Sequence, residues 1–86
     1  MTVRYHSRFL KVFEKLPPAI REKFFARLGL FHREPFHPLL NNHSVDAAYP
    51  RWRSMNVTGD YRALFEQVGD DTIVFMKIGT HSELCG

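Results

Sequence analysis

The segment RSMNVTGDYRALF, residues 53–65, decides the fold of this chain. Before the turn sequence Thr58-Gly59-Asp60, Trp52, Ser54 and Asn56 alternate with Arg53, Met55 and Val57. Alternation with a period of two indicates strands that bury one face. The segment therefore predicts a β-hairpin, in which a strand that reaches residue 57 is followed by a strand over residues 61–68.

Outward toward the C-terminus, a second turn at residues 69–71 leads into TIVFMKIG, residues 72–79. This run is nearly all apolar, as expected of a strand in the centre of a sheet. Three consecutive strands joined by short turns form an antiparallel meander. A short strand at residues 2–5 is expected to add an edge.

Toward the N-terminus, apolar residues recur with helical spacing in two segments. Residues 7–16 predict a first helix, with Ser7 as its N-cap, and the pair Pro17-Pro18 ends it. Residues 18–33 predict a second helix, and the proline-containing residues 34–50 are expected to be a loop. The expected core positions are Phe9, Val12, Phe13 and Leu16 in the first helix and Ile20, Phe24, Leu28 and Phe31 in the second.

These elements predict an α+β fold, in which an N-terminal helical hairpin packs on one face of a small antiparallel sheet. The other face of the sheet is expected to stay partly open. Because the chain has only 86 residues, we expect a single domain that spans residues 1–86.

Composition and motifs narrow the class of protein. Twelve Lys and Arg against nine Asp and Glu give a net charge of +3, which suits a polyanionic partner. The single cysteine, Cys85, excludes an intramolecular disulfide, and no apolar run approaches the ~20 residues that span a bilayer. No signal-peptide pattern is present, so we expect a cytoplasmic protein without membrane contact. Metal-ligand spacings and nucleotide-binding glycine motifs are also absent from the sequence, so we expect neither a metal nor a cofactor.

Several side chains have the chemistry of a catalytic or RNA-binding site. His81 follows the last strand, and an imidazole exchanges protons near neutral pH. Arg51, Arg53 and Arg62 lie on the two hairpin strands, where we expect them to converge on one face and bind phosphate. Tyr61, like Tyr49 and Trp52, offers a flat surface on which bases can stack.

The same residues also fit plainer roles. His81 is then a surface histidine, Asp60 an ordinary turn residue, and His43 a loop residue with a local hydrogen bond. Side chains alternate along a strand, so Trp52 points away from Arg51 and Arg53, and we expect its ring in the core. These patterns alone leave both interpretations open.

Taken in order, the segments resemble the RelE/ParE superfamily of toxins, on its YafQ-like side. Residues 53–65 resemble the central hairpin of these toxins, and IGTHSEL, residues 78–84, resembles their C-terminal signature. Residues 16–23, 35–39 and 41–44 resemble the first half of these proteins. The likeness spans essentially the full chain, and its GDYR and IGTHSEL segments are the specific ones.

The resemblance implies a compact α+β fold like that of microbial ribonucleases, and a type II toxin–antitoxin system. Such a toxin enters the ribosomal A site and cleaves mRNA, and a cognate antitoxin protein wraps it and blocks the site. By the same resemblance, His43, Asp60 and His81 serve the active site and Arg62 stabilises the phosphate. The expected activity is that of a metal-independent endoribonuclease, an mRNA interferase that inhibits translation.

Within that chemistry the 2′-OH of the RNA is the nucleophile. We expect His81 to be the general acid and His43 or Asp60 to be the base or its orienter. Two positions depart from the YafQ-like pattern: Asn56 stands where those toxins have a histidine, and Cys85 where members commonly carry an aromatic residue that stacks on an mRNA base.

Two other functions stay open at this point. One is a ParE-like toxin that inhibits DNA gyrase, although such members generally lack the terminal histidine signature, so His81 and Arg62 argue against it. The other is a catalytically degenerate module that only binds an antitoxin. Growth arrest on expression separates an active toxin from such a module, and a supercoiling assay detects a gyrase inhibitor.

Overall fold

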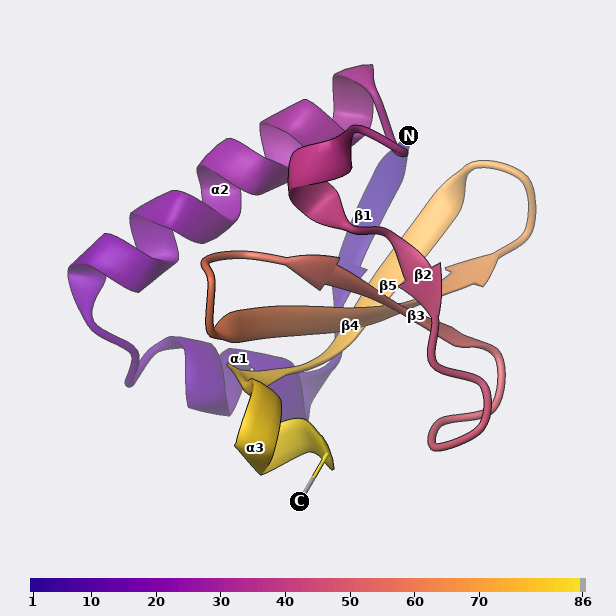
Figure 1. Cartoon of the computed structure of the whole chain (residues 1–86). Coiled ribbons are helices and arrows are strands. Elements are labelled where there is room, and N and C mark those ends of the chain that lie inside the picture. Colours follow the sequence, from indigo (N-terminus) through magenta and orange to yellow (C-terminus); the bar gives the residue numbers. More distant parts are fainter. Residues whose placement is uncertain (86) are drawn as a thin grey trace.

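A computed structural model describes residues 1–85 and shows a helical hairpin packed on one face of a five-stranded sheet (Figure 1). Gly86 and the side chain of Cys85 lie outside this description. The elements, in chain order, are β1 (Thr2–Tyr5), α1 (Ser7–Phe13), α2 (Pro18–Arg33), the 3-10 helix η1 (Pro38–Leu40), β2 (His43–Ser44), β3 (Trp52–Asn56), β4 (Tyr61–Val68), β5 (Thr72–Thr80) and α3 (His81–Cys85). None of the helices in residues 1–85 is both long enough and apolar enough to cross a membrane.

The sheet contains the predicted meander and the predicted edge strand β1, and it adds β2 at the other edge. Its order is β1-β5-β4-β3-β2, so the meander of β3, β4 and β5 forms the middle. Neighbouring strands are antiparallel except β1 and β5, which pair in parallel with Val3 opposite Ile73. A parallel pair needs a long connection, and the helical hairpin and the other strands supply it. The predicted fold class is therefore confirmed, and the parallel edge strand is the exception to the expected antiparallel sheet.

Aromatic side chains fill the space between the hairpin and the sheet. Phe9 of α1, Phe24 of α2 and Phe75 of β5 are each at most 1% exposed, and their ring centroids lie 5.0–5.7 Å apart. Tilted and edge-on ring contacts contribute about 0.5–1.5 kcal/mol per pair beyond the burial of apolar area. These contacts fix the hairpin to one face of the sheet, which leaves the opposite face to other segments.

The first helix differs from the prediction at both ends. His6, and not Ser7, is its N-cap, because the Nδ1 atom of His6 accepts a hydrogen bond from the Arg8 N–H at 3.1 Å. The helix ends at Phe13, and residues 14–16 form turns, because a residue before a proline disfavours helical geometry. Val12, which we expected in the core, is 44% exposed.

Three short elements lie where the sequence predicts none. The 3-10 helix η1 and the two-residue strand β2 fall in the predicted loop 34–50, and α3 follows β5 without a break. Elements of two to five residues are too short to show a period of side-chain burial. They matter for function, because β2 and α3 carry His43 and His81.

Candidate active site on the open face of the sheet

The face of the sheet turned away from the hairpin carries a second set of side chains, and we call it the open face. In β4, Arg62 and Leu64 alternate with the core residue Ala63, so they point to the open face. Ser54 stands opposite Leu64 in the neighbouring β3, and Asn56 stands opposite Arg62. The open face therefore presents a serine, an amide and a guanidinium on two adjacent strands.

Two segments cover part of the open face and leave a pocket between them. One is residues 45–51, which connect β2 with β3, and the other is α3. Leu64 and Ser54 are each only 3% exposed, although neither belongs to the core under the hairpin. The pocket has a volume of about 210 Å³, and its polar lining residues are Asn41, His43, Tyr49, Ser54, Arg62 and His81. Three residues that the sequence singles out for catalysis thus meet here from β2, β4 and α3.

His81 is positioned by a reciprocal cap at the start of α3. The Thr80 Oγ1 atom accepts a hydrogen bond from the Glu83 N–H at 3.3 Å, and Glu83 Oε1 accepts one from the Thr80 N–H at 2.7 Å. This is the Thr-x-x-Glu capping box, which satisfies two backbone donors at a helix start. The His81 N–H also donates to the Asp60 carbonyl at 3.0 Å, which joins α3 to the β3–β4 turn. His81 therefore leaves β5 in a defined direction at the pocket.

The cap gives a physical reason for two further residues of the C-terminal signature. Two hydrogen bonds from Thr80 hold the pKa of the Glu83 carboxyl below its ordinary value. The larger effect comes from the backbone N–H of Thr80 and the smaller one from its side chain. A Cβ atom on Gly79 would lie 3.2 Å from Glu83 Oε1 and 3.5 Å from Leu84 Cδ2. A side chain at position 79 would displace the capping carboxylate. Because glycine has no side chain, α3 can fold back against β5.

Arg62 is half-buried beside the β3–β4 turn. Its Nη1 atom donates to the carbonyl oxygens of Gly59 at 3.0 Å, Thr58 at 3.2 Å and Tyr61 at 3.4 Å. All three bonds use one nitrogen, and among residues 1–85 the Nε and Nη2 atoms make no hydrogen bond to the protein. A guanidinium that is anchored in this way keeps two donor nitrogens for a phosphate group at the pocket.

His43 lies on the edge strand β2, where its ring is exposed to the pocket. Its Nδ1 atom is 2.7 Å from the carbonyl oxygen of Asn41. A carbonyl oxygen only accepts hydrogen bonds, so Nδ1 carries the proton and the neutral ring keeps a lone pair on Nε2. Asn41 has a φ of 45°, a left-handed conformation that asparagine tolerates better than most residues, and it turns the chain from η1 into β2.

Asp60 contributes its backbone to the site. The residue is exposed at the β3–β4 turn, and its carboxylate is not part of the pocket lining. Its N–H donates to Thr58 Oγ1 at 3.2 Å, and its carbonyl accepts the hydrogen bond from the His81 N–H. Asp60 thus helps to orient His81 through the main chain.

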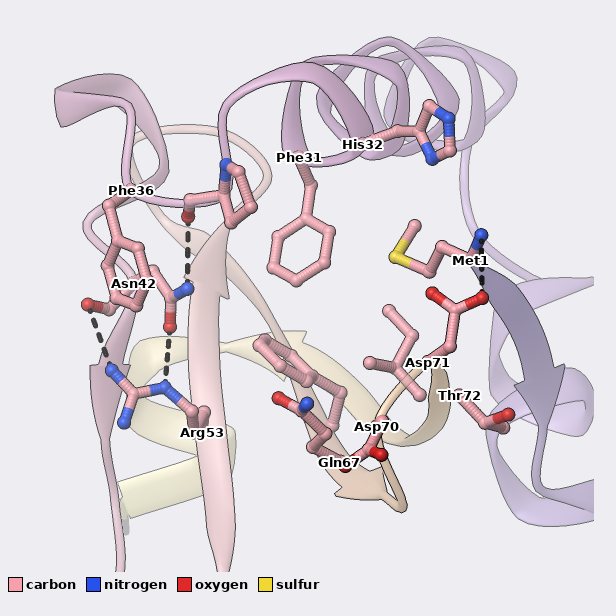
Figure 2. A pocket seen from close by; sticks show the side chains of 13 residues that line it. Met1, Phe31, His32, Phe36, Asn42, Arg53, Gln67, Asp70, Asp71 and Thr72 are labelled. Carbon is pink, nitrogen blue, oxygen red and sulfur yellow. Dashed lines mark hydrogen bonds and ion pairs between the residues drawn. The ribbon is translucent and has the colours of Figure 1, made fainter.

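Arg53 points to the opposite side of the sheet from Arg62. Its Nε donates to Asn42 Oδ1 at 2.8 Å, and its guanidinium carbon lies 5.7 Å from the centre of the Phe36 ring. Figure 2 shows Arg53 and Asn42 at the edge of a second, larger hollow of about 520 Å³, which also contains Phe31. The prediction that Arg51, Arg53 and Arg62 converge on one face is therefore wrong. The cause is strand alternation, because Arg53 pairs with the core residue Phe65.

Arg51 and Tyr61 also lie outside the pocket. Arg51 has a φ of 70°, and its side chain is 84% exposed and forms an ion pair with Glu66 at 3.7 Å. Its N–H donates to the Asp46 carboxylate at 2.5 Å, so Arg51 closes the 45–51 loop. Tyr61 packs against the core under the hairpin. The RNA-binding roles expected of Arg51, Arg53 and Tyr61 gain no support from these positions.

Tyr49 and Trp52, which the sequence offers as stacking surfaces, form an aromatic wall on the open face. Trp52 is half-buried outside the core cluster, so the expectation that its ring lies in the core is wrong. Its ring stacks on that of Tyr49 with centroids 5.0 Å apart and an angle of 2°. Side chains alternate along β3, so Trp52 lies on the same face of the sheet as Ser54, and this pattern was visible in the sequence. Nothing local to Tyr49 indicates that it lines the pocket.

The fold recurs in solved structures of bacterial and archaeal toxins. The chain is similar to a YoeB/ParE toxin from Agrobacterium tumefaciens, with a TM-score of 0.77 and 15% identity over 94% of this chain and 99% of that chain. It is similar to YafQ from E. coli, with a TM-score of 0.72 and 19% identity over 98% and 97% of the two chains. It is also similar to a chain of the RelB–RelE antitoxin–toxin complex from Methanococcus jannaschii, with a TM-score of 0.73 and 18% identity over 95% and 94%.

These likenesses are structural. No family model matches the sequence, and no curated protein matches it significantly. The expected likeness to RelE/ParE-superfamily toxins, YafQ among them, is confirmed at the level of the fold.

Proposed function

We propose that this chain is the toxin of a type II toxin–antitoxin system and acts as a ribosome-dependent mRNA endoribonuclease. The observation that carries the proposal is the meeting of His43, Arg62 and His81 at one pocket on the open face. Two imidazoles and a guanidinium are the groups that acid–base cleavage of a phosphodiester needs. The fold shared with YafQ and RelE supports the same function.

The reaction uses the 2′-OH of the RNA as its nucleophile. His43 takes the proton from the 2′-OH, and the 2′-oxygen attacks the adjacent phosphorus while the bond to the 5′-oxygen breaks. His81 donates a proton to the leaving 5′-oxygen. The products are a 2′,3′-cyclic phosphate on one fragment and a 5′-OH on the other, and the two histidines regain their starting protonation by exchange with water.

The contacts of each side chain support these roles. The Asn41 carbonyl holds the His43 proton on Nδ1, which leaves Nε2 as the base. The alternative base, the Asp60 carboxylate, gains less support because it does not line the pocket. Arg62 keeps Nε and Nη2 for the negative charge that develops on the phosphate oxygens.

The small size of the pocket favours dependence on the ribosome. Its volume of about 210 Å³ is below the range of roughly 300–1,000 Å³ that is usual for ligand pockets. Proteins that hold single-stranded nucleic acid by themselves contact ~4–16 nucleotides along a groove. A pocket of this size does not hold several nucleotides, so we propose that the A site of the ribosome presents the mRNA to it.

The proposed protein partner is a cognate antitoxin. Solved structures related to this fold include a DinJ–YafQ complex and RelB–RelE complexes. The net charge of +3 on this chain suits an acidic antitoxin segment that folds on binding and covers the open face. The proposed site of action is the cytoplasm, where mRNA is translated.

The test is induced expression of the parental chain and of His81→Ala in a bacterial host, with mapping of mRNA 5′ ends. We expect the parent to arrest growth and to produce new cuts in translated mRNA. We expect the variant to do neither, because loss of a general acid costs about 10²–10⁴-fold in rate. Growth arrest without new cuts, accompanied by inhibited DNA supercoiling, would contradict the nuclease and favour a gyrase inhibitor. A soluble parent that neither arrests growth nor cuts mRNA would favour a module that only binds antitoxin.

A further inference from the structure

One hydrogen bond joins the two segments that cover the open face. The hydroxyl of Tyr49, in the 45–51 loop, donates to the backbone carbonyl of Leu84, in α3, at 2.8 Å. The two residues are 35 positions apart in sequence, and both line the pocket that contains His81. Tyr49 thus bridges the pocket from one wall to the other.

The loop that carries Tyr49 has an ordered backbone. The Tyr49 N–H donates to the Val45 carbonyl at 2.8 Å, and the Tyr49 carbonyl accepts from the Trp52 N–H at 3.0 Å. Arg51 adopts a left-handed φ of 70°, which costs roughly 1–2 kcal/mol for a residue other than glycine, and the hydrogen bond of its N–H to Asp46 offsets part of that cost. The loop therefore presents Tyr49 in a fixed position.

The ring of Tyr49 is held as firmly as its backbone. Trp52 stacks on it in a nearly parallel arrangement, and the Lys77 ammonium lies 5.2 Å from its centre. An aromatic stack and a cation over a ring each contribute about 0.5–1.5 kcal/mol. The hydroxyl consequently projects toward Leu84 from a rigid support.

The helix at the other end of the bridge is too short to be stable by itself. It has five residues, whereas isolated helices shorter than roughly 12 residues are marginal in water. Its first turn is held by the capping box and by the His81–Asp60 backbone bond. Its last turn is held by the bond from Tyr49 to the Leu84 carbonyl, which is one of the carbonyl groups that a helix end leaves unpaired.

We infer that Tyr49 is a positioning residue for His81: it holds the end of α3 against the 45–51 loop and so fixes the imidazole over the pocket. As a role in catalysis, this inference rests on the proposed nuclease function. Catalytic groups lose rate steeply with misplacement, and an error of about 1 Å costs up to ~10²-fold. Removal of the Tyr49 hydroxyl should therefore lower the turnover without removing any group that touches the RNA phosphate.

The variant that isolates this bond is Tyr49→Phe, which keeps the ring and its stack on Trp52. We expect kcat for cleavage of ribosome-bound mRNA to fall about 10- to 100-fold with KM changed less than about threefold. We also expect faster hydrogen exchange at the α3 amides and a shifted His81 ring signal by NMR. The matched control is Tyr5→Phe, which removes the same atom from a ring that packs against Phe9 and Phe75 on the covered face. It should leave all three readouts unchanged.

The outcomes separate this inference from the proposed function. If Tyr49→Phe cleaves at the parental rate or faster, Tyr49 does not position His81, and a faster rate would identify the bond as a latch that RNA has to open. If the parent does not cleave mRNA at all, the nuclease proposal fails. The NMR measurements still show whether the Tyr49 hydroxyl holds α3 in place. In Tyr49→Phe, unchanged hydrogen exchange at the α3 amides together with an unchanged His81 ring signal would overturn this positioning role. Changes in both would support it. A folding defect in Tyr49→Phe would appear as an unfolding midpoint shifted from those of the parent and of Tyr5→Phe.

Discussion

The covered face of the sheet is packed with phenylalanine rings, whereas the open face carries histidine, arginine and two stacked aromatic rings. On the covered face, Phe9, Phe24 and Phe75 contact one another directly, and their contribution is to stability. On the open face, His43 and His81 are exposed and are held in place through their backbones and neighbours. A substitution should therefore affect mainly folding on one face and mainly activity on the other.

The largest expected effect lies on the covered face. Phe24→Ala removes a ring that is 0% exposed, so we expect it to lower the free energy of unfolding by about 3–5 kcal/mol. For a small domain this is a large part of a total of roughly 5–15 kcal/mol. Urea unfolding, followed by the fluorescence of Trp52, the single tryptophan of the chain, measures it. The control Phe36→Ala, whose ring is 71% exposed, should cost about 1 kcal/mol or less. Equal losses of unfolding free energy in both variants would contradict the claim that rings buried under the hairpin stabilise the fold.

The next effect concerns the two arginines that strand alternation separates. Arg62→Gln removes the cation at the pocket, and we expect cleavage to slow about 10²–10³-fold with little change in stability. Arg53→Gln removes a cation on the opposite side of the sheet, and we expect a cleavage rate within about twofold of the parent. Both rates are measured by primer extension on translated mRNA. A loss of activity in Arg53→Gln as large as that in Arg62→Gln would show that RNA binds across both faces.

The smallest expected effect is a pH dependence at the cap of α3. The pKa of the Glu83 carboxyl is lowered by its hydrogen bond to the Thr80 N–H, so the carboxylate contributes stability that is fully present above its ordinary pKa. This contribution is lost as the pH falls through the lowered pKa of the folded chain. Glu83→Gln keeps a capping side chain that does not titrate. The parent should therefore lose stability relative to Glu83→Gln on acidification, and superimposable unfolding profiles across that pH range would refute the role of the cap.

The sequence was most informative where a pattern repeats. The alternation up to residue 57, the turn at 58–60 and the apolar run 72–79 predict the meander, because each strand pattern extends over several residues. The parallel pairing of β1 with β5 could not be predicted, since a four-residue strand shows no preference for a partner. Helix α3 was missed because its five residues follow the apolar strand directly, although Thr80-x-x-Glu83 is a recognisable capping box.

The same limit applies to the candidate site. His43, Arg62 and His81 were singled out by residue type and by resemblance, and their meeting in one pocket depends on strand pairing across the sheet. Arg53 was grouped with Arg62 although alternation along β3 and the register with β4 separate them. The bridge from Tyr49 to Leu84 spans 35 residues, and no local pattern encodes such a contact.

The central claim is that the open face uses the 2′-OH of the RNA as the nucleophile, with His43 and His81 as base and acid. The most direct measurement is cleavage of an mRNA that is bound in the ribosomal A site and carries a single 2′-deoxynucleotide at the mapped cut. We predict that cleavage at that position disappears, while the matched all-ribose mRNA yields a fragment that ends in a 2′,3′-cyclic phosphate. Cleavage of the deoxy-substituted mRNA at the same bond and rate would contradict the account, because the nucleophile would then come from elsewhere.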